Sequence, residues 1–468
     1  MELYSENENY KLYKGNMLDM LEVIEPNTID AVITDPPYEL NFMNKGWDNS
    51  GIAFQKETWQ KCYEVLKSGG YLLAFGGSRT FHRIACAIED AGFEIRDTIM
   101  WLYGSGFPKS MALDKSLEAK LKYGNANKTE FHKLSGIQEN KHHYGFTTAN
   151  KEQGIRPKDY TIEGASNQYL KELEATTDLA KKFKGWGTAL KPSYEPIIVA
   201  RKPFKGSLVD NVIEYGVGGI NIDECRVKSN GEKLTRDLYD NPSWKNCSKA
   251  GQGSVNDVAD ILGRFPANTI LTYDETDFDE VCGAMPYTKS GGGDKSTKCG
   301  NTFLGTGYGG TNTTKYEANE GSASRYFYCA KASKRDRDEG LDGFNETTVN
   351  DGRQTPIDNA FQRGETQRKN SHPCVKPCDL MQYLVRLVTP NGGIILDPFN
   401  GSGSTGKAVM YENKERNKNY KYIGIELTEE YLPISKARID HLIDIPKEEP
   451  KEDIPTGQTN IFDFIESE

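Results

Sequence analysis

Four consecutive residues, Asp35-Pro36-Pro37-Tyr38, have the chemistry needed to hold a planar base that carries an exocyclic amino group. The two prolines fix their own φ angles and have no backbone N–H, so the turn presents carbonyl oxygens. The Asp35 carboxylate and the Pro36 carbonyl can each accept one amino hydrogen, and the Tyr38 ring can stack on the base. The apolar run 29–33 predicts a buried strand that positions this turn. We predict that Asp35, Pro36, Pro37 and Tyr38 are catalytic.

A second segment, residues 397–406, predicts a site for a nucleoside cofactor. It follows the apolar run 393–396 and is typical of a strand, a glycine turn and a helix. Glycines allow a ligand to approach the backbone, and a helix N-terminus supplies N–H donors. The next predicted strand ends in an acid about 20 residues later, a distance that suits ribose hydroxyls. The cofactor-binding residues expected here are Asp397, Phe399, Gly401, Gly403, Thr405 and Glu426.

Together these segments resemble the β group of DNA amino-methyltransferases, which methylate adenine N6 or cytosine N4 with S-adenosylmethionine. In that group the Asp-Pro-Pro-Tyr element comes first, a long insert follows, and the glycine-rich element comes last, as it does here. The resemblance covers residues 10–105, 185–225 and 325–440. The segments that are similar to phage- and prophage-type members are 75–80, 104–109, 194–199 and 372–377.

The resemblance implies further site residues and partners. Lys376 lies in the segment that it assigns to the cofactor pocket. Asn16 stands where the family usually has an aspartate for the cofactor's adenine, and its amide oxygen can accept the same hydrogen bond without charge. Asn16 is equally typical of a turn at a strand end. The implied substrate is double-stranded DNA with a flipped base, and the implied enzyme is a monomer or homodimer. Nine cysteines without an export signal favour reduced thiols in the cytoplasm.

Aspartate at the first motif position favours adenine N6 within this family, with cytosine N4 as the alternative. An RNA base-amine methyltransferase and a catalytically inactive DNA-binding relative stay open as further alternatives. The intact residues Asp35, Tyr38, Gly401 and Gly403 argue against an inactive relative. The recognition sequence and a paired restriction enzyme cannot be inferred from these residues.

Three rival chemistries are disfavoured. A nucleotide-hydrolysing P-loop needs Ser or Thr after its lysine, whereas Ala408 follows Lys407. A cysteine nucleophile at Cys374 would need an activated thiolate, and the resemblance assigns that segment to the cofactor pocket. The cysteines lack a CxxC pair, so we expect no metal site.

Strands that alternate with helices predict an α/β fold with a doubly wound, mostly parallel sheet. The resemblance implies the Rossmann-like S-adenosylmethionine-dependent methyltransferase form of this fold, with a long target-recognition insert. The expected units are a catalytic half at 1–104, a polar insert with possible DNA contact at 105–190, a closing strand at 191–204, a target-recognition region at 205–324, a cofactor-binding half at 325–444, and an acidic linker with a C-terminal peptide at 445–468.

Charge is unevenly distributed along the 468 residues, whose formal net charge is −10. Counted over Lys, Arg, Asp and Glu, residues 1–100 carry about −7 and residues 101–210 about +6, which favours a local DNA-facing surface. The residues expected to contact DNA are Lys181, Lys182, Lys184 and Arg201. No apolar run approaches the length of a membrane span, so none is expected.

The C-terminal tail joins an acidic linker to an apolar cluster. Gln458, Ile461, Phe462 and Phe464 resemble the short peptides that dock on the bacterial sliding clamp. The linker composition predicts a solvated tether. The alternative is a tail that packs back onto its own domain.

Overall fold

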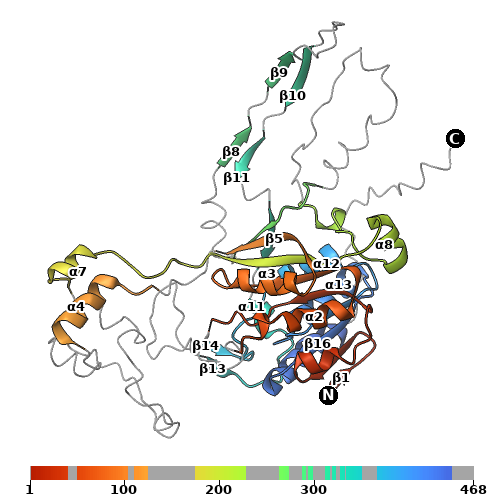
Figure 1. Ribbon diagram of the computed structural model, residues 1–468, viewed down its shortest axis with the longest axis horizontal. Coiled ribbons are helices and arrows are strands. Elements are labelled where there is room, and N and C mark those ends of the chain that lie inside the picture. The colour runs from red at the N-terminus through yellow and green to blue at the C-terminus, as the bar shows by residue number, and fades with distance from the viewer. Residues whose placement is uncertain are drawn as a thin grey trace.

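The structure is a computed structural model in which a large sheet carries helices on both faces (Figure 1). It describes residues 2–40, 50–103, 110–124, 174–227, 263–273, 287–290, 293–298, 311–316, 319–322, 327–331, 334–349 and 366–444.

Ten strands form the central sheet, in the order β1-β2-β16-β15-β3-β4-β6-β5-β7-β12. These strands are β1 (Glu2–Glu6), β2 (Tyr10–Lys14), β3 (Ile29–Thr34), β4 (Leu66–Phe75), β5 (Glu94–Tyr103), β6 (Tyr194–Arg201), β7 (Thr269–Tyr273), β12 (Tyr328–Lys331), β15 (Ile394–Asp397) and β16 (Lys421–Glu426). Only the pairs that involve β1 or β6 are antiparallel within this sheet. The prediction of a doubly wound, mostly parallel sheet is confirmed.

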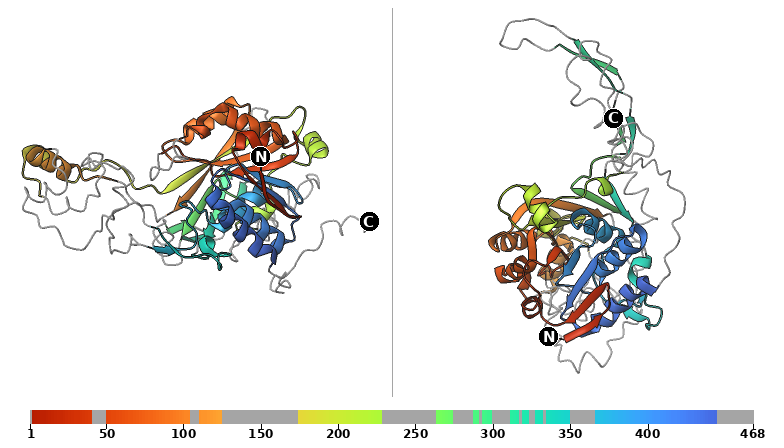
Figure 2. Two further views of the ribbon diagram at one scale, coloured as in Figure 1. Left: turned by 90° about the horizontal axis from the view of Figure 1, so that it is seen from below. Right: turned by 90° about the vertical axis from the view of Figure 1, so that its right-hand side faces the viewer.

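Helices from the N-terminal and C-terminal parts of the chain cover opposite faces of the sheet. Figure 2 shows the red and orange helices on one side of the strands and the blue helices on the other. The first group is α1 (Met17–Leu21), α2 (Lys56–Val65) and α3 (Phe81–Asp90), and the second is α12 (Cys378–Val388), α13 (Ser404–Arg416) and α14 (Leu432–Asp444). Short 3-10 turns at Ile52–Phe54, Asp223–Cys225 and Glu429–Tyr431 precede or join these elements.

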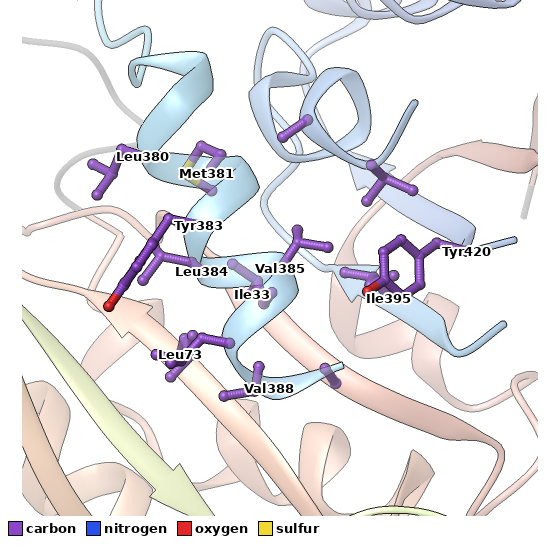
Figure 3. Packing of buried hydrophobic residues seen from close by; sticks show 14 of the residues in the cluster. Ile33, Leu73, Leu380, Met381, Tyr383, Leu384, Val385, Val388, Ile395 and Tyr420 are labelled. Carbon is purple, nitrogen blue, oxygen red and sulfur yellow. The ribbon is translucent and has the colours of Figure 1, made fainter. Parts of the chain in front are cut away.

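Alternation along the buried strands explains the two layers of core. Ile33 and Leu73 belong to the cluster that α12 covers, where they lie near Leu384 and Val388 (Figure 3). The intervening Val32 belongs to the cluster on the other face. Strands buried on both faces read as continuous apolar runs, and residues 29–34 are all buried.

The expected closing strand, 191–204, lies inside the sheet. β6 pairs with β5 in the antiparallel direction. It also pairs with β4 on its other side, and β7 and β12 continue the sheet beyond β5. The prediction that this strand closes the sheet is therefore wrong, because β7 from the later insert and β12 from the start of the 325–444 segment extend the sheet beyond β5.

Smaller elements lie around this sheet. They are α4 (Leu113–Tyr123), α7 (Asp178–Lys182), α8 (Leu208–Tyr215), α11 (Lys334–Asp338), β8 (Tyr287–Ser290), β9 (Gly293–Lys298), β10 (Thr311–Tyr316), β11 (Asn319–Ser322), β13 (Thr347–Val349) and β14 (Thr366–Arg368). β8 pairs with β11 and β9 with β10, which places paired strands in the glycine-rich part of the insert. Among the described helices, none has the length and apolarity to cross a membrane.

Candidate active site

The two motif turns meet at the carboxyl ends of parallel strands. β3 lies beside β15, and the chain winds outward from this pair in both directions, to β4 and to β16. Ligands of open α/β sheets bind at such a switch point, outside the carboxyl ends of the strands. The turn after β3 carries Asp35 and Tyr38, and the turn after β15 carries the glycines.

The two oxygens of the Asp35 carboxylate have different environments. Oδ2 accepts a hydrogen bond from Lys376 Nζ at 2.5 Å. Oδ1 is buried and has no hydrogen-bond partner within the described chain. Buried acceptors nearly always have a donor in folded proteins. A ligand that brings an N–H group to Oδ1 would satisfy it.

Tyr38 is held at both ends. Its hydroxyl donates to Glu195 Oε2 at 2.8 Å, and its carbonyl accepts from Thr80 Oγ1 at 2.8 Å. Burial and the nearby charges of Asp35 and Glu195 raise the pKa of Tyr38 well above its ordinary value, so the hydroxyl stays protonated. The ring is thereby fixed beside the Asp35 turn. A Cβ at Gly77 would come within 3.2 Å of the ring.

Lys376 lies beside Asp35 and Glu195. Its ammonium is 2.5 Å from Asp35 Oδ2 and 3.6 Å from Glu195 Oε2, and the residue is 7% exposed. Burial alone would lower the pKa of Lys376, but the charges of Asp35 and Glu195 outweigh burial and raise it. The rings of Tyr38, Phe75 and Trp101 surround the same ammonium at 5.0–6.0 Å. The sequence resemblance placed this lysine in the cofactor pocket, whereas its ion pair places it beside Asp35 in the turn after β3.

Asp397 organises the turn after β15. Its Oδ1 accepts from Thr34 Oγ1 at 2.6 Å and from the Phe399 N–H at 3.1 Å, and its Oδ2 accepts from Thr405 Oγ1 at 2.7 Å. Burial raises the pKa of Asp397 to about 6 against these hydrogen bonds. Asp397 and Thr405, both 2% exposed, therefore bind each other and the motif strand β3. Their contacts position the loop from beneath.

Glu426 lies at the end of β16, next to the glycine loop. Its Oε2 accepts from the Gly401 N–H at 2.6 Å and its Oε1 from the Thr428 N–H at 2.7 Å. A carboxylate has about four acceptor positions, so both oxygens retain capacity for further donors. Burial raises the pKa of Glu426.

The loop itself has the backbone of a ligand cradle. Gly401 and Gly403 have φ angles of +51° and +75°, a region that favours glycine. Gly403 is the N-cap of α13, and no side chain caps that helix. The N–H groups at the start of α13, which no side chain caps, are of the kind that bind hydroxyl and anionic groups of a ligand.

Asn16 caps the helix that follows β2. Its Oδ1 accepts from the Leu18 N–H at 3.1 Å, which makes it the N-cap of α1. The preceding Gly15 N–H donates to the Glu426 carbonyl at 3.0 Å, so Asn16 lies near the end of β16. The turn role considered from the sequence is present, and a contact of Asn16 with the cofactor stays a prediction.

A family model described as DNA methylase, N6_N4_Mtase, matches residues 29–437, which is most of the chain.

The chain belongs to the DNA methylase family.

Several Type II methyltransferases are similar to this DNA methylase. M2.LlaDCHI of Lactococcus lactis subsp. cremoris is 24% identical over 242 residues, which cover 46% of this chain and 81% of that protein. M.HpaI of Haemophilus parainfluenzae is 33% identical over 106 residues, or 21% of this chain and 34% of that protein. M2.MboI of Moraxella bovis is 40% identical over 90 residues, or 19% of this chain and 30% of that protein.

Solved structures also align with the DNA methylase over most of its length. The PvuII DNA methyltransferase (cytosine-N4-specific) is 12% identical with a TM-score of 0.37, covering 93% of this chain and 90% of the other. The M1.HpyAVI–SAM complex is 15% identical with a TM-score of 0.34, covering 92% and 99%.

Residues that sequence analysis missed support the glycine loop from α14. Arg438, which is 1% exposed, donates to the Ser402 carbonyl and, at 3.0 Å, to its hydroxyl. Ser435 Oγ accepts from Asn400 Nδ2 at 2.9 Å. The sequence held one indication that Arg438 is buried. It falls midway between Ile434 and Leu442 at four-residue spacing, on the apolar face of a helix.

The four expected DNA contacts do not lie together. Lys181 and Lys182 are in α7 and Lys184 follows it, all exposed, on an arm that lies apart from the sheet (Figure 1). Arg201 ends β6, at the opposite end of the strand from Glu195, and its guanidinium donates to Glu94 Oε2 at 2.8 Å. The structure therefore separates Arg201 from the three lysines.

The predicted clamp peptide, Gln458 to Phe464, lies outside the described residues, as do 104–109 and most of the target-recognition region. Among the described residues, no group of three or more His, Cys, Asp or Glu side chains could hold a metal ion.

Proposed function

We propose that this DNA methylase transfers a methyl group to adenine N6 in double-stranded DNA. The observation that carries the proposal is the buried Oδ1 of Asp35, which has no donor among the described residues, beside a turn that presents carbonyls and a fixed tyrosine ring. An amino group is the donor that this acceptor lacks. Membership of the DNA methylase family supplies the reaction class.

The cofactor of the proposed reaction is S-adenosylmethionine, which supplies an activated methyl group when bound. Glu426, the loop from Phe399 to Gly403 and the uncapped start of α13 would hold it. Asp397 and Thr405 would act through the loop that they brace. Lys376 belongs to the base pocket, where it neutralises one oxygen of Asp35.

The base pocket must make a weak nucleophile reactive. The adenine amino lone pair is delocalised into the ring, so hydrogen bonds to Asp35 Oδ1 and the Pro36 carbonyl would localise it. The same groups stabilise positive charge that develops on nitrogen, the electrostatic contribution that is usually largest. The base has to leave the duplex at a cost of a few kcal/mol, and stacking on Tyr38 offsets about 1–3 kcal/mol of that.

The aspartate of the motif supports adenine over cytosine N4, because the resemblance associates aspartate at this position with adenine. A cytosine amino group would satisfy the same acceptors and is the alternative substrate. Long-read sequencing of plasmid DNA from cells that express the chain distinguishes the two and gives the recognition sequence. Modified adenines that disappear with Asp35→Ala support the proposal, and plasmids without any modified base contradict it.

The proposed DNA contacts outside the pocket lie on the α4–α7 arm, residues 110–124 and 174–193. This arm has seven lysines against four acidic residues, and one of those acids, Glu118, is fully buried and bonded to Thr176, Thr177 and Lys122. Residues 190–193 run from the arm directly into Tyr194 and Glu195. DNA bound to the arm would therefore lie at the edge of the sheet that carries Glu195 and Tyr38.

We also propose that the C-terminal peptide docks on a sliding clamp. Support comes from the Gln458, Ile461, Phe462 and Phe464 pattern beyond an acidic linker. A tether of this kind raises the local concentration of the enzyme at newly replicated DNA.

A further inference from the structure

We propose that Glu195 is a positioning residue for the target base. It orients the Tyr38 ring through the phenol hydroxyl, and it holds Lys376 against one oxygen of Asp35 so that the other oxygen stays available. The inference rests on the proposed function and deepens it, because it names a residue outside both motif turns that sets the geometry of the base pocket.

The strand direction of β6 brings Glu195 to the site. β6 runs opposite to β4, and Ile197 pairs with Phe75 at the carboxyl end of β4. The Gly76 N–H donates to the Pro196 carbonyl at 3.0 Å, so the start of β6 is tied to the turn after β4. A parallel strand in this place would present its last residue at this edge. The reversed strand presents its second residue instead.

Two tyrosine hydroxyls contact the carboxylate of Glu195. Its Oε2 accepts from the Tyr38 hydroxyl at 2.8 Å, and its Oε1 accepts from the Tyr103 hydroxyl at 3.4 Å. Burial and the charge of Glu195 raise the pKa of Tyr103, so this hydroxyl also remains a donor. Two donors on two oxygens leave the carboxylate little rotational freedom. The Tyr38 ring is then held in one orientation before a base arrives.

Contacts on the other side set the charge of the pocket. Lys376 Nζ lies between Glu195 at 3.6 Å and Asp35 at 2.5 Å. Two carboxylates and one ammonium leave a net charge of −1, which suits an amino nitrogen that becomes positive. Without the Glu195 charge, Lys376 would neutralise Asp35 alone and the net charge of the three groups would be zero. Glu195 therefore acts on the reacting atom through Lys376.

The test compares two substitutions that remove different parts of this role. Glu195→Gln keeps an acceptor for Tyr38 and removes only the negative charge. We therefore expect kcat to fall roughly tenfold to a hundredfold, the size of effect seen when a residue that orients a functional side chain is lost. The KM for DNA should stay nearly unchanged. Glu195→Ala also frees Tyr38, and it should raise the KM for DNA as much as Tyr38→Phe does. Calorimetry should show S-adenosylmethionine affinity within about twofold of wild type for both.

A double-mutant cycle separates positioning from mere stability. If Glu195 acts through Lys376, the loss from Glu195→Gln should vanish or reverse in a Lys376→Met background, because contacting residues are non-additive. The matched control is Glu94→Gln, which removes a carboxylate from the Arg201 ion pair at the far end of β6 and should leave kcat unchanged. Additive losses, or a Glu195→Gln enzyme within twofold of an active wild type, would overturn the inference. A wild type that methylates no DNA would instead overturn the proposed function.

Discussion

The two carboxylate oxygens of Asp35 differ in their hydrogen bonding. Lys376 occupies Oδ2, and Oδ1 is buried without a donor in the described chain. The short motif made the carboxylate predictable. The different environments of its two oxygens depend on Lys376 and Glu195, which lie 341 and 160 positions further along the chain. Lys376 was assigned to the cofactor because its own segment resembles a cofactor segment, and only the fold brings it to Asp35.

Removing the Asp35 carboxylate should stop catalysis without affecting the cofactor. Asp35→Ala should lower kcat at least about a hundredfold, the scale for one hydrogen-bond partner of a transition state. S-adenosylmethionine affinity by calorimetry should stay near wild type, because the proposed contact of Asp35 is with the base and not with the cofactor. Near wild-type methylation by the purified variant would contradict this role.

Glu426 is expected to bind the cofactor and to brace its loop. Glu426→Ala should weaken S-adenosylmethionine binding by about 1–3 kcal/mol, the range for hydrogen bonds to a charged acceptor. The control is Glu429→Ala, an exposed acid three residues later that pairs with Lys14. Equal affinities of Glu426→Ala and wild type in calorimetry would show that Glu426 does not hold the ribose.

At the scale of elements, the parallel sheet and the helices on both faces follow from the sequence. The apolar run before Asp35 is buried along its whole length, as a strand covered on both faces requires. The pairing of β6 with β4 and the strands β7 and β12 could not be predicted, because their pairing partners lie 58 or more residues away and leave no local pattern. Arg438 shows the same limit, because its bond to Ser402 depends on how α14 packs against the glycine loop.

The glycine loop gives a prediction with a matched control. Gly403 has φ +75° and an added Cβ would meet Ser435 Oγ at 2.5 Å, whereas Gly216 has φ +74° and open space. Gly216→Ala should cost about 1–2 kcal/mol of unfolding free energy from the left-handed backbone alone. Gly403→Ala should cost more by denaturant unfolding and should weaken S-adenosylmethionine binding. Equal costs and unchanged binding would show that the Ser435 contact is unimportant.

At the scale of the whole molecule, the expected contacts with DNA and with a sliding clamp lie outside the two motif turns, mainly in the inserts and the tail. The α4–α7 arm has the buried acid Glu118 at its centre and lysines on its surface. Arg201 instead forms an ion pair with Glu94 on the neighbouring strand of the sheet. Charge counting found the basic segment. It could not separate a surface lysine from an arginine that is paired at a strand end, because that distinction depends on which strands are neighbours.

The arm lysines should set the salt dependence of DNA binding. Replacing Lys181, Lys182 and Lys184 with Ala should weaken binding to all sequences and reduce the salt slope by roughly one unit for each lost phosphate contact. A control variant with Lys11, Lys56 and Lys205 replaced by Ala removes the same charge from exposed positions elsewhere. Identical slopes for the two variants, measured by fluorescence anisotropy, would place the arm away from DNA.

The tail should affect location and leave chemistry intact. Deleting residues 454–468 should leave methylation of short duplexes unchanged in vitro and abolish co-purification with the host sliding clamp. Re-methylation behind the replication fork should slow, because the tether no longer concentrates the enzyme there. A truncated protein that unfolds at a lower temperature or loses activity on short DNA would show that the tail packs on its own domain.

Identification of the methylated nucleoside tests the central claim most directly. The purified chain is incubated with double-stranded DNA and S-adenosylmethionine that carries an isotopically labelled methyl group, and the DNA is digested and analysed by mass spectrometry. The account predicts label in N6-methyladenine, and none when Asp35→Ala replaces the wild type. Label in N4-methylcytosine would contradict the proposed base while keeping the reaction class. Label on a ring carbon, or no label in DNA at all, would contradict the account of the site.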